Sequence, residues 1–140
     1  MTYEKIRTAR ITHHWNSSVE EVILQIERVT NGEGTPYSDE AFSEEPPGVI
    51  KTIIRRLSFD ETIPNTLKAR LELCDRCMEY IVQPSWHEGY DACCSLKKRS
   101  QLEVEILTKT GHIEATYRYA ADKAHRYWFL AGWLAACRVN

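Results

Sequence analysis

The chain has 140 residues, of which 43% are hydrophobic and 27% charged, with a formal net charge of −2 and five cysteines. This length suits one domain with its own core, and the composition excludes the disordered, collagen-like and coiled-coil classes. The acidic balance argues against a dedicated nucleic-acid binder, and the odd cysteine count argues against a secreted disulfide framework. We therefore expect one domain over residues 1–140 in the reducing cytoplasm. No apolar run reaches the roughly 18–20 residues of a membrane span, so we expect no membrane segment.

The first 30 residues predict a strand followed by a helix. Residues 3–14 alternate loosely between apolar and polar side chains, which we interpret as an edge strand, with a short helix as the alternative. A capping box then begins at Ser18, and apolar residues recur every three or four positions as far as Val29. Asn31 and Gly32 predict the end of this helix.

Residues 31–48 have the composition of a mobile acidic loop, with five acidic side chains, no basic one and several glycines and prolines. Acidic segments that contain aromatic residues can dock on a basic partner surface and become ordered there. The expected partner-binding side chains of this loop are acidic or aromatic: Tyr37, Asp39, Glu40, Phe42, Glu44 and Glu45.

Two further helices are predicted in the middle of the chain. Pro47 suits a first helical turn, and isoleucines and a leucine follow at helical spacing as far as Leu57. Asn65 is a suitable N-cap for the next helix, which is expected to stop before Pro84. The buried stripe expected on this helix consists of Leu67, Leu71, Cys74, Met78 and Ile81.

The fold class rests on residues 84–119. Residues 84–100 have no clear period and are interpreted as an irregular link, whereas apolar and polar residues alternate over 102–106 and again over 112–119. A turn at Gly111 would join these runs into a hairpin. We therefore predict an α+β fold, with about four helices packed on a small antiparallel sheet built around the 101–119 hairpin.

The last predicted helix, residues 121–138, contains eleven consecutive residues, 127–137, with no polar side chain apart from a tyrosine hydroxyl. It is too short for a membrane span and too apolar for a helix with one buried face. It is therefore either the centre of the core or also part of an interface, which would be a homodimer or a partner contact. The interface residues on this second interpretation are Trp128, Phe129 and Trp133.

Four of the five cysteines lie between residues 74 and 94, where zinc chemistry is conceivable. Structural zinc needs four thiolate or imidazole ligands, and the candidate set is Cys74, Cys77, His87 and Cys93 (or Cys94). However, both cysteines of the Cys-x2-Cys pair fall inside a predicted helix, where buried free thiols are common. We prefer unliganded thiols and no cofactor, with zinc as the alternative and a redox role as a third interpretation.

No motif for phosphate cradling, metalloprotease, nucleophile-elbow or calcium chemistry is present, so an enzyme is not favoured. The preferred hypothesis is a small intracellular protein that binds another protein, of the inhibitor, immunity or accessory-subunit type. The alternative is a nucleic-acid-binding regulator that uses two basic groups, Arg55 and Arg56 together with Lys97, Lys98 and Arg99.

A third hypothesis concerns the stretch predicted as irregular, because binding residues often lie in loops. It is a small ligand-binding domain or enzyme with a pocket near Trp86, His87 and Tyr90.

Overall fold

The computed structural model describes residues 18–34, 36 and 47–139, and in these ranges the chain forms helices joined by turns, with no strand. The predicted α+β class is therefore wrong, and the described chain is all-helical. The helices are α2 (Val19–Thr30), α3 (Pro47–Ser58), α4 (Asn65–Cys77), a π-helical segment η1 (Met78–Val82), α5 (Gln83–Ser100), α6 (Val104–Arg118) and α7 (Lys123–Cys137). The edge strand predicted at 3–14 lies outside the described residues.

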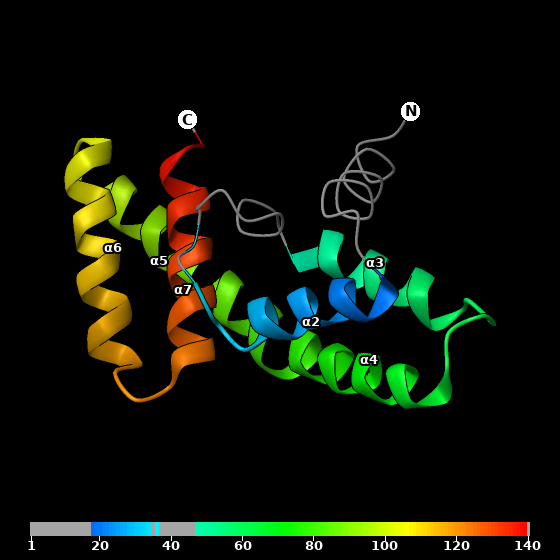
Figure 1. Ribbon diagram of the computed structural model, residues 1–140. Helices are drawn as coiled ribbons and strands as arrows, with labels where there is room; N and C mark the ends of the chain where they lie inside the picture. The colour runs from blue at the N-terminus through cyan, green and yellow to red at the C-terminus, as the bar shows by residue number, and fades with distance from the viewer. Residues whose placement is uncertain (1–17, 35, 37–46, 140) are drawn as a thin grey trace.

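α4, η1 and α5 follow one another without a break and form a helical spine over residues 65–100. At 1.5 Å per residue the spine is about 54 Å long. Figure 1 shows α2 and α3 packed along its α4 half and α6 and α7 along its α5 half. The spine therefore joins two groups of helices that are distant in sequence.

The spine passes through Pro84, where the sequence predicted a helix end. Proline has no amide hydrogen, and its ring clashes with the carbonyl four residues earlier in a regular α-helix. The π-helical turn before it widens the backbone, with the Gln83 amide donating to the Met78 carbonyl five residues back. The helix therefore continues as α5 across the stretch that the sequence predicted to be irregular.

α6 occupies the position of the predicted hairpin. Its buried residues Leu107, Gly111 and Ala115 lie four positions apart, which is one face of a helix. Ile106 and Ile113 are apolar but exposed on the other side. Since apolar residues lie on both faces, the sequence alternates over short windows and imitates a strand, and this is the physical reason for the wrong prediction.

The apolar run of α7 is explained by two cores that share this helix. Tyr127, Trp128 and Ala131 pack with α2, α3, α4 and η1. Phe129 and Trp133 pack with residues of α5 and α6 on another side of α7. α7 is therefore central to the molecule, which is the first of the two interpretations of this run. In the part of the chain described, no helix combines the length and the apolarity needed to cross a membrane.

Glycines allow α5 and α7 to cross with their backbones in contact. A Cβ atom on Gly89 would lie 1.9 Å from the Phe129 carbonyl oxygen, and one on Gly132 would lie 1.9 Å from the Trp86 carbonyl oxygen. Both distances are far below van der Waals contact, so neither position accepts a larger side chain without separating the helices.

Two indole N–H groups connect α7 to its neighbours. Trp128 Nε1 donates to the Val29 carbonyl at the end of α2, at 3.0 Å. Trp133 Nε1 donates to the Leu107 carbonyl of α6, at 2.7 Å, and its ring lies against Gly111. These bonds satisfy buried polar groups, and they fix the end of α2 and the helix α6 beside α7.

Candidate functional site

The outer face of α6 carries large apolar side chains that the described chain leaves exposed. Ile106, Ile113 and Tyr117 are 47%, 69% and 85% exposed. With Thr110 they recur at intervals of four, three and four residues, so all four lie along one line on the helix. We call these four residues the outer seam of α6.

Thr110 contributes little polarity to the outer seam. Its hydroxyl donates to the Ile106 carbonyl at 2.8 Å, so its hydrogen-bonding need is met within the helix. Single exposed apolar residues are normal on a protein surface, but a contiguous apolar line on one helix is typical of a contact with another helix. Figure 1 shows α6 at the edge of the molecule, with α5 and α7 on one side of it only.

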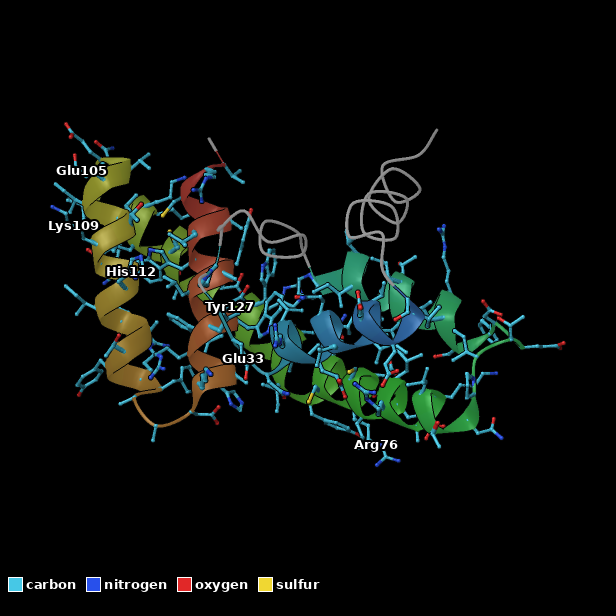
Figure 2. All side chains as sticks on the ribbon, viewed as in Figure 1. Glu33, Arg76, Glu105, Lys109, His112 and Tyr127 are labelled. Atoms are coloured by element: carbon cyan, nitrogen blue, oxygen red, sulfur yellow. The ribbon has the colours of Figure 1, made fainter. Side chains whose placement is uncertain are left out.

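Charged residues border the outer seam. On one flank the Lys109 ammonium lies 3.8 Å from the Glu105 carboxylate, and His112 is exposed nearby on the same helix (Figure 2). On the other flank Arg118 Nε donates to Glu114 at 3.1 Å. On the first flank the charge that a helix lying on the seam would meet is therefore the Lys109 ammonium, partly offset by Glu105.

The C-terminal end of α6 is fixed to α5 by the Glu88 carboxylate. Glu88 accepts hydrogen bonds from Arg118 Nη1 at 2.9 Å and from the Tyr119 hydroxyl at 2.6 Å. Burial and the adjacent Glu88 raise the pKa of Tyr119 to about 12, so its hydroxyl stays a donor at neutral pH. The Arg118 guanidinium also lies 5.0 Å from the centre of the Phe129 ring. α6 therefore presents its outer seam from a rigid position.

The partner-binding residues predicted from the sequence fall into two groups. The acidic loop residues Tyr37 to Glu45 lie outside the described residues, and their role stays a prediction. Trp128, Phe129 and Trp133 are buried within this chain by α2, α5 and α6. Any surface for a partner or a homodimer on the described chain is therefore formed by residues other than these three.

The four candidate zinc ligands do not converge. Cys74 and Cys93 are on the same continuous spine, 19 residues apart, which is about 28 Å along a helix, far beyond the ~2.0–2.3 Å bonds of zinc. Cys74 is buried in the core formed by α2, α3, α4 and η1, and Cys93 contacts Cys137. In the described chain no group of three or more histidine, cysteine or acidic residues is arranged to hold a metal. Zinc binding by some other ligand set stays a prediction.

The buried thiols are poorly suited to redox chemistry. The sulfurs of Cys93 and Cys137 are 3.6 Å apart, and both residues are buried. Burial raises the pKa of the Cys93 thiol to about 12 and that of the Cys74 thiol to about 11. At neutral pH these thiols are protonated, whereas the thiolate is the reactive form.

The two basic groups predicted for nucleic-acid binding lie far apart. Arg55 lines a groove of about 440 Å³ between α3 and α4 together with Lys51 and Arg76, and Glu72 and Asp75 offset part of this positive charge. Lys97 donates to the Ala136 carbonyl at 3.1 Å and to the Val139 carbonyl, so it caps the end of α7. The structure thus assigns Lys97 a structural contact and does not bring the two groups together on one face.

The third predicted site, around Trp86, His87 and Tyr90, lies on α5 rather than on a loop. Trp86 stacks on Tyr90 one turn later, with ring centres 5.1 Å apart, and both pack against the cores. His87 is exposed beside them. A ligand site on this face of α5 stays a prediction.

Comparisons with protein-family models, with curated proteins and with solved structures found no match. The geometry of the chain itself therefore carries the functional argument. Sequence reasoning missed the outer seam, although its signal was present: Ile106, Thr110, Ile113 and Tyr117 have heptad spacing, opposite the line of Leu107, Gly111 and Ala115.

Proposed function

We propose that this chain is a protein-binding module, and that the outer seam of α6 binds an amphipathic helix of another protein. The observation that carries the proposal is the line of exposed apolar side chains at Ile106, Ile113 and Tyr117. Helices pack lengthwise when apolar side chains repeat every three or four residues, so a second helix is the partner shape that matches this spacing. The proposal keeps the binding function expected from the sequence and moves it to a different surface.

The occupant that we expect is a different protein rather than a second copy. Two α6 helices can pack lengthwise about a two-fold axis in a parallel or an antiparallel arrangement. In the antiparallel arrangement the Lys109 flank of one copy would meet the same flank of the other, where each Lys109 is already paired with Glu105, so charge gives a second copy no advantage. A different helix can place acidic residues along that whole edge and so meet Lys109 with opposite charge.

The size of the outer seam supports a transient complex. The line from Ile106 to Tyr117 is about 17 Å long and one helix wide, which is less than the ~800 Å² per partner of a standard stable interface. Covering an apolar side chain contributes at most about 1.5–3 kcal/mol, whereas association costs at least ~4 kcal/mol. Three apolar side chains therefore leave at most about 5 kcal/mol, and we expect dissociation constants on the order of 0.1 mM or weaker, with the charged flank setting specificity.

The proposal is tested by photo-crosslinking in the source cell, with a photoreactive amino acid at position 113 and, as the matched control, at Phe59. Phe59 is 78% exposed but lies in the turn after α3. The expected result is a crosslink from position 113 alone to a helical segment of a different protein, with apolar residues three and four apart. Crosslinks only to a second copy, or the same adducts from both positions, would contradict the proposal.

A further inference from the structure

A second feature, separate from the outer seam, is a cavity of about 310 Å³ between the turn after α2, the inner edge of α6 and the start of α7. Its volume is at the lower end of the range for small-molecule sites. Figure 2 shows Tyr127 on α7 and His112 on the neighbouring α6, and both side chains line the cavity.

The wall on the α2 side depends on glycine. Gly32 and Gly34 have φ angles of +78° and +89°, which other residues adopt only with strain. A Cβ atom on Gly32 would lie 2.6 Å from the Lys123 carbonyl oxygen, so the turn lies directly against the first turn of α7. This close approach fixes one side of the cavity with backbone rather than with flexible side chains.

The side chains at one end of the cavity are basic, and they lie at the N-terminus of a helix, where acidic residues are usually preferred. Lys123 and Arg126 lie in the first two turns of α7, and the first turn contains no acidic residue. The N-terminus of a helix carries a partial positive charge, so cations there reduce stability and anions are attracted. His112 adds a third basic group from α6.

Nearby acids offset only part of this charge. Glu33 is 3.9 Å from Lys123 Nζ, half-exposed, and equally close to Arg28. Asp122, the N-cap of α7, is paired with His125 at 2.6 Å. Asp122 is therefore paired with His125, and Glu33 is shared between Lys123 and Arg28, so neither acid fully neutralises the basic residues of the cavity.

The cavity also has an apolar side and a fixed donor. Tyr127 is buried, and with Leu130 and Ala115 it forms an apolar wall. Arg126 Nη1 donates to the Ala120 carbonyl at 2.7 Å, which orients the guanidinium at the turn between α6 and α7. The site thus combines a cationic end and an apolar end in a space of small-molecule size.

We propose that this cavity binds a small organic anion, with a carboxylate or phosphate group toward Lys123 and Arg126 and an apolar body against Tyr127 and Leu130. The two cations supply charge-assisted hydrogen bonds to the anionic group, and the apolar wall covers the remainder of the ligand.

Calorimetry and thermal unfolding of the full chain test the proposal with four probes. Benzoate and phenyl phosphate combine an anionic group with a ring, benzyl alcohol has the ring alone, and inorganic phosphate has the anion alone. We expect benzoate or phenyl phosphate to bind saturably and raise the melting temperature, and to bind at least about tenfold more tightly than the other two. Equal binding of benzyl alcohol, or no saturable binding of either ring anion at millimolar concentration, would overturn the proposal.

Variants locate the site. Lys123→Gln with Arg126→Gln is expected to weaken the ring anion by at least about tenfold, whereas the matched pair Arg55→Gln with Lys109→Gln, also basic residues on helices, leaves affinity unchanged. The first pair removes cations from a helix N-terminus, which favours folding, but it also removes the Arg126 bond to Ala120 and the Lys123 contact with Glu33, so the melting temperature of the variant without ligand is compared with that of the parent.

A second variant, Thr116→Trp, fills the cavity from α6 without altering its charge and is expected to abolish binding. If the ring anion still binds both the Lys123 and Arg126 double variant and the Thr116→Trp variant with unchanged affinity, this cavity is not its binding site. The variant Ile113→Glu is expected to bind the ring anion normally, which separates this site from the outer seam.

Discussion

The close contact of α5 with α7 offers a stringent test of the fold, through the substitution Gly132→Ala. The added methyl group would lie 1.9 Å from the Trp86 carbonyl oxygen, 2.7 Å from its carbonyl carbon and 3.0 Å from its Cα. All three are backbone atoms of α5, so no side-chain rotation can relieve the overlap. α5 and α7 must therefore move apart along a contact that runs through both cores.

Gly132→Ala is expected to lower the free energy of unfolding, although the same change in an exposed helix usually raises it. Replacing glycine by alanine within an exposed helix typically adds ~1 kcal/mol of stability. Overpacking costs about 1–3 kcal/mol even where flexible side chains can adjust, and here backbone must move. We expect Gly132→Ala to lower the free energy of unfolding by at least ~2 kcal/mol net.

The matched control is Gly48→Ala in α3. A Cβ atom at Gly48 meets no atom of the described chain within 4 Å, so this substitution should leave stability unchanged or raise it by up to ~1 kcal/mol. Urea denaturation followed by tryptophan fluorescence and by circular dichroism measures both variants. A Gly132→Ala variant as stable as Gly48→Ala would refute the packing of α5 on α7 described above.

Three further substitutions test the interior. Ser85 is buried and its hydroxyl has no hydrogen-bond partner among the described residues, so Ser85→Ala should stabilise the chain by ~1 kcal/mol in urea denaturation, and a loss of that size would show that the hydroxyl is bonded. Trp128→Phe leaves the Val29 carbonyl without its donor and should cost about 1–3 kcal/mol in the same assay; no change would contradict the link between α2 and α7. The thiol pKa of Cys74 is raised to about 11, whereas that of an unfolded cysteine is ~8.5, so the unfolded chain releases this proton first as pH rises. The stability from Cys74 is therefore fully present below about pH 8.5 and is lost as pH rises toward 11. Denaturation at pH 8 and pH 10.5 should show a smaller loss in Cys74→Ala than in the parent, and equal losses would contradict the burial of this thiol.

The first three helices were predictable because each has one buried face. Apolar residues recur at helical spacing in α2, α3 and α4, and the Ser18 cap bonds to the Glu21 amide as the capping box predicts. Such helices can be predicted from local sequence, because a single apolar stripe along the helix identifies the face that packs against the core. The apolar stripe of α4 also correctly predicted that Cys74 is buried.

The second half of the chain was not predictable from local pattern. α6 is apolar on two faces, and α7 lies between two cores, so neither helix shows the single stripe that identifies a surface helix. The path through Pro84 depends on a π turn that no residue pattern signals. These features are set by contacts between distant segments, such as Gly89 with α7, which a local window does not contain.

The candidate surface was hidden for the same reason. Until the inner face of α6 is identified by Gly111 and Trp133, Ile113 and Tyr117 look like the buried side of a strand. Once the helix is placed, they become its exposed side.

The central claim is that the outer seam of α6 binds a helical partner, and it is tested most directly by the affinity of the protein captured from position 113. We predict that Ile113→Glu raises its dissociation constant at least about tenfold, while Phe59→Ser, an equally exposed apolar residue elsewhere, leaves it unchanged. Circular dichroism should be the same for both variants, because neither side chain is buried. Equal affinity of Ile113→Glu and the parent chain for that partner would contradict the account.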